Sequence, residues 1–427
     1  MIRGVIEGFY GPPWSWDERA EVMAWCHERG MTHYVYAPKS DPKHRDRWRE
    51  PYGPSELAGF SRLVGQKTLQ VGFAVSPGLT MDYRSAGDRA SLSGKIEQVL
   101  DCGVGLVCVA FDDIPNRPGL GEQHAEITGW LHDRLGKEVD LLLVPTEYVG
   151  SKRTPYLGAL ADGLPGDVPV AWTGMAVVND TIRMEEARAR AESLKGRAPL
   201  LWDNYPVNDG PMADRLHMGP LRGREPGLPG VCSGYLANPM VQARSSKLPL
   251  ASIAGWLRGA DPEAAWLADA GEWRVFAEAC DGKVPRDLVE TLVETGDGPD
   301  WQAPATALAE WLKRAATCEA PGLEGEAGPW LEQVHAEARV ALEMLRLLQA
   351  RTASDPFDFE DAFRLLTDWS ALRRSAVSVM GLRFGVRPAM GQRADGGWAL
   401  GPAMVQEGEN AVDRLARYAL AVLARLE

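Results

Sequence analysis

Two adjacent aspartates, Asp112 and Asp113, directly follow an apolar run that ends at Phe111. A buried strand that ends in paired carboxylates places two like charges at one point, which is costly unless a site uses them. Close carboxylates push their pKa values apart, so one can hold a proton near neutral pH while the other stays ionised. A general acid beside an electrostatic partner requires this arrangement. The structural alternative is a pair of aspartates that caps the next helix.

The aspartates belong to a region in which short apolar runs alternate with helical patterns. Several runs are continuously apolar, which is typical of parallel strands covered on both faces. We expect strands at 4–7, 32–37, 69–76, 105–111, 140–145, 168–172, 199–202 and 230–236, and helices that include 17–29, 95–102 and 181–194. Eight such units predict an α/β fold of the (β/α)8 TIM barrel type. An open doubly wound sheet is the alternative, but no Gly-x-Gly-x-x-Gly follows the first strand.

Polar, aromatic or glycine residues follow every predicted strand. In a (β/α)8 barrel the catalytic groups lie at these carboxyl ends. The residues include Gly8, Lys39, Ser76, Asp112, Asp113, Glu147, Tyr148, Trp172, Asn204, Asp209 and Asn238. A single polar strand end could be a cap or a turn, but all eight together favour a binding site. Donors, acceptors and aromatic faces on one rim suit a hydroxyl-rich, sugar-like substrate.

Composition limits the class of protein. The chain has 427 residues, of which 45% are hydrophobic and 25% are charged, as in a soluble globular protein of about two domains. Its net charge of -13 argues against nucleic acid or an anionic membrane as the main partner. No apolar run reaches the roughly 18 to 20 residues of a membrane span. Without a signal-peptide pattern or a Cys-x-x-Cys, we expect reduced thiols and a cytoplasmic location.

Longer motifs stand in order along the predicted barrel. They are 4–14 (GVIEGFYGPPW), 34–42 (YVYAPKSDP), 44–52 (HRDRWREPY), 76–78 (SPG), 111–114 (FDDI), 145–148 (PTEY), 172–174 (WTG), 201–204 (LWDN) and 237–239 (ANP). This set resembles glycoside hydrolase family 84, the β-N-acetylglucosaminidases that include protein O-GlcNAcase and the so-called hyaluronidases. The resemblance covers the whole predicted barrel, and the rest of the chain matches only in being helical.

The resemblance implies retaining, substrate-assisted hydrolysis of β-linked N-acetylglucosamine (GlcNAc). The 2-acetamido oxygen of the substrate attacks the anomeric carbon and forms an oxazoline, so no protein nucleophile is needed. Asp113 would protonate the leaving oxygen and then activate water. Asp112 would accept a hydrogen bond from the acetamido N–H and balance the charge that develops on the oxazoline. Tyr148 and Asn204 would contact the acetamido group, and Trp202 would line the pocket of its methyl.

The resemblance also assigns contacts to the sugar hydroxyls. Asp209 would bind the outer hydroxyls with Asn238 beside it, and Lys39 and the backbone of Gly8 would contact the ring hydroxyls. Two structural alternatives stay open here. Asp209 could be a solvated acid in a surface loop, and Lys39 could form a simple ion pair with Asp41.

Other charged residues near the rim are expected to have no catalytic role. We expect Glu7 and Glu147 to be structural, and the charged run 44–50 to be a solvated helix or loop. A metal hydrolase would place histidines at strand ends. None of the seven histidines directly follows a predicted strand, so we expect neither a metal nor another cofactor.

The remaining sequence, 243–427, predicts an all-α helical bundle domain after a barrel domain at 1–242. Apolar residues recur at three- and four-residue spacing in 264–280, 301–318, 330–351, 358–384 and 407–427. The glycine- and proline-rich stretch 381–402 is expected to be a long loop that covers the barrel mouth or a dimer partner. A homodimer through the helical domain is therefore a further hypothesis.

The sequence favours an exo-β-N-acetylglucosaminidase that acts on a glycoprotein, a glycan or a small conjugate. One alternative is a catalytically silent glycan-binding or scaffolding protein, which would have no need of an acid such as Asp113. Another is a glycosidase dedicated to a specialised small-molecule GlcNAc conjugate. The motifs describe the sugar in the first subsite and leave the aglycone undecided.

Overall fold

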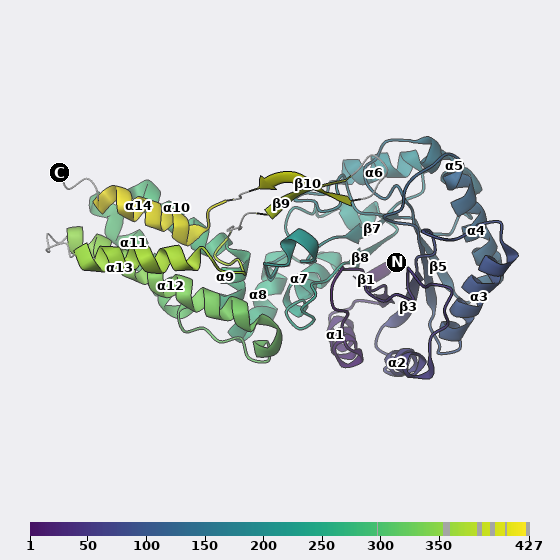
Figure 1. Cartoon of the computed structure of the whole chain (residues 1–427), viewed down its shortest axis with the longest axis horizontal. Coiled ribbons are helices and arrows are strands. Elements are labelled where there is room, and N and C mark those ends of the chain that lie inside the picture. The colour runs from purple at the N-terminus through teal and green to yellow at the C-terminus, as the bar shows by residue number, and fades with distance from the viewer. Residues whose placement is uncertain (297, 353–358, 382–386, 393–397, 406–407, 424–427) are drawn as a thin grey trace. The chain divides into compact units, whose positions relative to one another are not determined.

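A computed structural model describes residues 1–296, 298–352, 359–381, 387–392, 398–405 and 408–423 (Figure 1). Its parallel strands run in the order β5-β4-β3-β2-β1-β8-β7-β6. They are β1 Ile2–Glu7, β2 His33–Tyr36, β3 Gln70–Val75, β4 Leu106–Ala110, β5 Asp140–Val144, β6 Ala171–Trp172, β7 Leu200–Asp203 and β8 Gly234–Ala237. A parallel bridge between Leu143 and Val170 joins β5 to the chain that leads into β6. The sheet thus closes into a barrel, and the predicted (β/α)8 fold is confirmed.

Helices connect the strands around the outside of the barrel (Figure 1). They are α1 Trp16–Glu28, α2 Pro54–Gly65, α3 Ala86–Leu100, α4 Leu120–Leu135, α5 Pro155–Gly163 and α6 Met184–Ser193, and α7 Lys247–Leu257 follows β8. Local signals start several of them. Ser15 forms a capping box with Glu18 at the start of α1, and the hydroxyl of Thr154 caps α5 ahead of Pro155.

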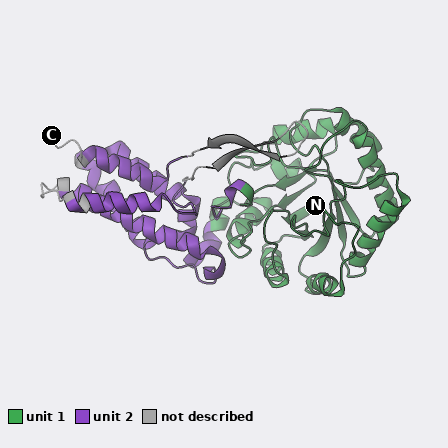
Figure 2. Cartoon of the chain, viewed as in Figure 1, with its two compact units in different colours: residues 1–210, 220–266, 391–399 green, residues 211–219, 267–390, 400–427 purple. Residues whose placement is uncertain are grey.

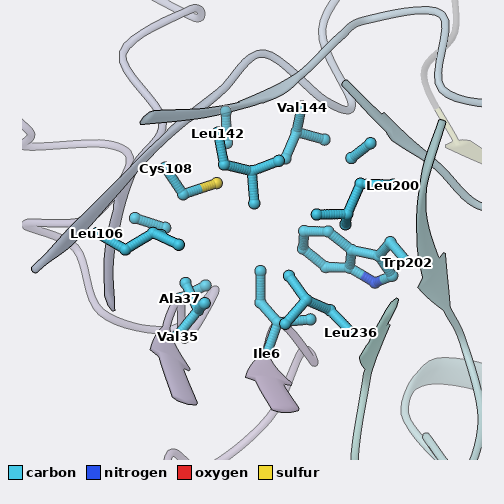
Figure 3. Packing of buried hydrophobic residues seen from close by; sticks show 13 residues of the cluster. Ile6, Val35, Ala37, Leu106, Cys108, Leu142, Val144, Leu200, Trp202 and Leu236 are labelled. Carbon is cyan, nitrogen blue, oxygen red and sulfur yellow. The ribbon is translucent and has the colours of Figure 1, made fainter. Parts of the chain in front are cut away.

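The barrel interior is filled by small and branched side chains from the strands. Figure 3 shows Ile6, Leu200, Trp202 and Leu236 pointing into this cluster. Trp202 is only 6% exposed, and its indole lies against the backbone of Gly8. A Cβ at Gly8 would lie 2.4 Å from the Trp202 ring, so a side chain there would displace the indole. The end of β1 therefore needs glycine because of the tryptophan on β7.

The chain forms two compact units, which Figure 2 colours separately. The first comprises 1–210, 220–266 and 391–399, and the second 211–219, 267–390 and 400–427. The second unit is mainly helical: α9 Arg274–Asp281, α10 Lys283–Thr295, α11 Gln302–Ala315, α12 Glu324–Thr352, α13 Phe359–Leu372 and α14 Ala411–Leu423, with α8 Pro262–Ala270 crossing the division. The domain limits 1–242 and 243–427 stay predictions. Among the described residues, none of the helices is long and apolar enough to span a membrane.

Two expectations for the C-terminal region are wrong. The stretch 381–402 is not one long loop, because β9 Arg387–Gln392 and β10 Trp398–Val405 pair in a two-stranded sheet. Glycine and proline suggested a loop, but both strands of so small a sheet are edges, where a missing N–H is tolerated. The helix expected at 358–384 ends at Leu372. Beyond it, Ser378 N–H donates to Asp214 O and Met380 N–H to Ala279 O, so the chain bonds to other segments instead.

Two buried histidines make stability depend on pH. Burial lowers the pKa of His44 to about 4 and that of His124 to about 3. Both are neutral in the folded protein over a range in which the unfolded chain, with an ordinary pKa of about 6.5, binds protons. The free energy of unfolding therefore rises with pH between about 4 and 6.5. Each histidine should make it about 2 kcal/mol smaller at pH 5 than at pH 7.

Chemical denaturation of the wild type and of His124→Gln at pH 7 and pH 5 measures this effect. The His124 ring lies between the hydroxyls of Tyr83 (2.9 Å) and Tyr156 (2.8 Å), so glutamine keeps polar partners there. The variant should lose about 2 kcal/mol less than the wild type on acidification. His132→Gln, at a partly exposed site, is the matched control. An unchanged pH dependence in His124→Gln would contradict the prediction.

Candidate active site

A buried ion pair forms the charged centre of the barrel rim. Asp112, just after β4, places Oδ2 against Nζ of Lys39 from the β2–α2 loop, with side-chain exposures of 9% and 3%. Burial alone raises the pKa of Asp112, but the positive charges of Lys39 and Arg45 hold it below the ordinary value. The alternative pairing of Lys39 with Asp41 is wrong. Asp41 instead accepts hydrogen bonds from the hydroxyls of two tyrosines.

The second carboxylate oxygen of Asp112, Oδ1, has no such partner in the described part of the chain. It is buried and accepts no hydrogen bond from the described residues. A buried acceptor without a partner is costly, and native proteins leave few of them. The oxygen is therefore available to a donor that a bound molecule supplies.

Asp113 presents its carboxylate between two tyrosines. Its Oδ1 accepts from the Tyr148 hydroxyl and its Oδ2 from the Tyr10 hydroxyl, both at 2.7 Å. Burial and the negative charge of Asp113 raise the pKa of both phenols well above the usual value, so both remain donors. Asp113 has φ +52°, which is uncommon outside glycine. This backbone conformation lets the consecutive side chains of Asp112 and Asp113 both lie at the same site.

Amide side chains connect the ends of three strands. Gly8 N–H donates to Asn238 Oδ1 (3.1 Å), and Asn238 Nδ2 donates to Asn204 Oδ1 (2.9 Å). The same Asn204 oxygen accepts from Trp202 Nε1 (3.0 Å), and Asn204 Nδ2 donates to Val177 O (2.7 Å). The chain of bonds fixes the indole and both amides at the ends of β1, β7 and β8.

Asp209 joins the site through Tyr10. Its Oδ2 accepts from the Tyr10 N–H at 2.7 Å, and burial raises its pKa. Asp209 is therefore partly buried and engaged, unlike a solvated loop acid. Tyr10 thus contacts Asp209 through its backbone and Asp113 through its side chain. The sequence reasoning did not select Tyr10 as a site residue, although its position two residues after Gly8 at a strand end was an available signal.

Two glutamates near the rim have structural partners. Glu7 is fully buried and binds Arg19, the hydroxyl of Tyr34 and the N–H of Trp14. Glu147 is partly buried and accepts from Asn116 Nδ2 and the Thr154 hydroxyl. Among the described residues, the hydrogen-bond partners of these two carboxylates do not include the aspartate pair, so both glutamates lie outside the connected site.

The charged run 44–50 is solvated only in part: Asp46, Arg47, Arg49 and Glu50 are exposed as expected, but the other three residues are not. His44 and Trp48 are fully buried and Arg45 is only 9% exposed. Arg45 donates to Asp113 O from Nη2 (3.0 Å) and, in a longer contact, to Asp112 O from Nη1 (3.5 Å). The burial of these three residues was missed because the charges of the run suggested full exposure, although the spacing of 44, 45 and 48 is that of one face of a helical turn.

The profile of the beta-N-acetylglucosaminidase family matches residues 3–280, which include every residue of this site. The chain belongs to this family. It is the one that the sequence motifs resembled, glycoside hydrolase family 84, whose members are glycoside hydrolases.

Individual proteins extend the comparison. Protein O-GlcNAcase from Rattus norvegicus and from Mus musculus are each 32% identical over 276 residues, which is 60% of this chain and 30% of each relative. The aligned region is thus under a third of those proteins. An O-GlcNAc hydrolase variant from Thermobaculum terrenum superposes with a TM-score of 0.79 at 25% identity, covering 100% of this chain and 94% of that one. CpGH84B gives 0.79 at 28% identity, with coverage of 89% and 74%.

Without Lys39, the buried negative charge of Asp112 would lack its main counterion. We expect Lys39→Met to lower the free energy of unfolding at pH 7 by about 3–5 kcal/mol. The deficit should shrink at pH 5, because a proton can then replace the lost cation on Asp112. Urea denaturation at both pH values measures this.

Two further variants control the experiment. Lys43→Met removes a partly exposed cation from the same loop, where it pairs with Glu56, and should cost about 1 kcal/mol or less. Lys39→Met/Asp112→Asn removes both charges and should be more stable than Lys39→Met alone. Equal losses in the two single variants would contradict the assignment of Lys39 as the counterion.

Proposed function

We propose that the protein is a retaining exo-β-N-acetylglucosaminidase that removes terminal β-linked GlcNAc through an oxazoline intermediate. The observation that supports this most directly is the pair of environments within Asp112. One oxygen is neutralised by Lys39, and the other is a buried acceptor without a partner among the described residues. The N–H of a 2-acetamido group is a donor of the kind that this oxygen lacks.

In the proposed first step, the acetamido N–H donates to Asp112 Oδ1, which aligns the acetamido oxygen with the anomeric carbon. The acetamido oxygen forms a bond to C1 as the bond from C1 to the leaving oxygen breaks. Asp113 transfers its carboxyl proton to that leaving oxygen. The ionised Asp112 balances the positive charge on the oxazoline, and the fixed orientation gives the advantage of an intramolecular nucleophile.

In the second step Asp113 is the base. It takes a proton from water, the water oxygen attacks C1, and the C1–O bond of the oxazoline breaks to restore the acetamido group. The configuration at C1 is retained because two inversions occur. Before the first step Asp113 must carry a proton and present it to the leaving oxygen, so the tyrosine hydroxyl beside the protonated oxygen must make space for that group. Tyr10 is 48% exposed and Tyr148 is 7% exposed, which makes Tyr10 the hydroxyl with room to move.

The other rim residues supply the sugar pocket in this proposal. Trp202 would line the acetamido methyl, with Tyr148 and Asn204 contacting the polar end of the same group. Asp209 and Asn238 would bind outer hydroxyls, and Lys39 and the Gly8 backbone would contact ring hydroxyls. The amide chain from Gly8 to Val177 supports these roles, because it fixes the groups before substrate arrives.

Hydrolysis of 4-nitrophenyl β-N-acetylglucosaminide tests the reaction. We expect turnover by the wild type, no comparable turnover of the β-glucoside, and a loss of about 10²–10⁴-fold in kcat for Asp113→Ala, which lacks the acid and base. Asp133→Ala, on α4 with its side chain 89% exposed, is the matched control and should keep full activity. Turnover of the β-glucoside at a similar rate would contradict acetamido assistance.

Asp112→Asn separates the two aspartates. It keeps the shape of the side chain but removes the anion that accepts the acetamido N–H and balances charge, so kcat should also fall by about 10²-fold or more. Asp113→Ala should lose less with a good leaving group than with an alkyl aglycone, because a good leaving group needs little protonation. Asp112→Asn should lose a similar factor in kcat with both substrates. The ratio of the kcat values on the two substrates, measured for each variant, distinguishes the roles of the two aspartates.

Exo action needs its own measurement. From a GlcNAc trisaccharide labelled at its reducing end, the first products should be the unlabelled monosaccharide and the labelled disaccharide, as cleavage at the non-reducing end requires. Binding of the trisaccharide without hydrolysis by folded wild type would instead favour the catalytically silent glycan-binding alternative. A homodimer through the helical region remains a proposal, which sedimentation velocity can test.

A further inference from the structure

The backbone at the aspartate pair is held in an unusual form. Asp113 lies in the left-handed region, at φ +52°, and Asp112 immediately precedes it. A residue other than glycine persists in such a conformation only when its surroundings fix it. Side-chain contacts alone are a weak restraint, because Lys39 and the two tyrosines hold the carboxylates at their far ends. The peptide carbonyls of Asp112 and Asp113 need a partner of their own.

Arg45 supplies that partner from a different part of the barrel. Its two Nη atoms approach the carbonyl oxygens of both aspartates, at 3.0 Å for Asp113 and 3.5 Å for Asp112. The guanidinium is the side chain best suited to this, because it offers several N–H donors in one rigid plane. Its side chain is nearly buried, so these bonds form in surroundings where water competes little.

The segment around Arg45 is itself fixed. His44 O accepts from the Ser76 N–H (2.8 Å), and the His44 ring contacts Ala74 O through Nδ1 (2.8 Å). Trp48 Nε1 donates to the Thr80 hydroxyl (3.0 Å). These contacts attach the β2–α2 loop to the end of β3 and the loop after it. Arg45 can therefore reach past β3 to the end of β4 from a rigid base.

We propose that Arg45 is a positioning residue, which holds the Asp112–Asp113 backbone in the turn that presents both carboxylates to the substrate. This inference rests on the proposed function, since it concerns the two aspartates to which that function assigns the chemistry. Arg45 acts through their backbone and does not itself contact the sugar. Its positive charge also helps Lys39 to keep the pKa of Asp112 low.

Kinetics of Arg45→Met, Arg45→Lys and Arg47→Met on the chromogenic β-N-acetylglucosaminide provide the first readout. Arg45→Met loses the donors to both carbonyls, and kcat should fall by about 10²-fold with little change in KM, because misplacement of a reacting group by about 1 Å has such an effect. Arg45→Lys keeps the charge but not the planar guanidinium group, so its kcat should lie between those of the wild type and Arg45→Met. Arg47 lies in the same loop with its side chain 55% exposed, and Arg47→Met should match the wild type.

Crystal structures of the same variants provide a readout that does not depend on activity. In Arg45→Met, Asp113 should leave the left-handed region and lose its bond to the Tyr148 hydroxyl. If Asp113 keeps its backbone and both tyrosine bonds, the proposal is wrong whatever the rate. A moved Asp113 with unchanged kcat would also overturn it.

The two readouts separate this proposal from the proposed function. If the wild type hydrolyses no β-N-acetylglucosaminide, the proposed function fails and the crystal structures alone decide whether Arg45 fixes the turn. If Arg45→Met does not fold, Arg45→Lys takes its place in both measurements. Equal kcat and an unmoved Asp113 in Arg45→Lys and Arg47→Met would then overturn the proposal.

Discussion

The ion pair between Asp112 and Lys39 is the interaction on which the rest of the site depends. A carboxylate this deeply buried is stable in its charged form only with a counterion beside it, and here the cation comes from the loop after β2. Strand β3 lies between β2 and β4 in the barrel, so the loop after β2 must reach across its end. The motif at that end is compact: a Cβ at Gly78 would lie 2.9 Å from Ile114. Glycine at this position thus lets the loop after β3 pack closely against the loop after β4.

The rim has one half built around the aspartate pair and another built mainly from neutral groups, with the carboxyl group of Asp209 beside them. Lys39, Arg45 and the aspartate pair lie at the ends of β2 and β4, whereas amides, an indole and backbone groups lie at the ends of β7, β8 and β1. Tyr10 connects the halves, because its hydroxyl reaches Asp113 and its N–H reaches Asp209. A ligand that fits must therefore place a donor toward Asp112 and its hydroxyls toward the neutral groups. A 2-acetamido sugar has this distribution of polarity.

Much of this arrangement follows from the sequence, because strand ends in a parallel barrel meet at one rim. Continuous apolar runs predicted the strands, and the residues after them include the aspartate pair, Tyr148 and Asn204 that the structure brings together. The role of the segment around Arg45 did not follow, since its burial depends on contacts with β3 and β4 that are remote in sequence. The pairing of β9 with β10 was missed for a related reason: glycine and proline carry different meanings in an edge strand and in a loop.

The environment of Asp112 also suggests how the site distinguishes its sugar. In the proposed function, a β-glucoside would leave part of the pocket empty, because a hydroxyl takes the place of the larger acetamido group. The Asp112 acceptor would lose the amide N–H, and Trp202 would lose the methyl. Sites built around a buried polar group reject an analogue that leaves it unpaired by factors of about 10⁴–10⁵. A purely apolar pocket discriminates far less. In the proposed function, the buried carboxylate that makes Lys39 necessary for stability would therefore also contribute to selectivity, because a buried acceptor without its donor is costly.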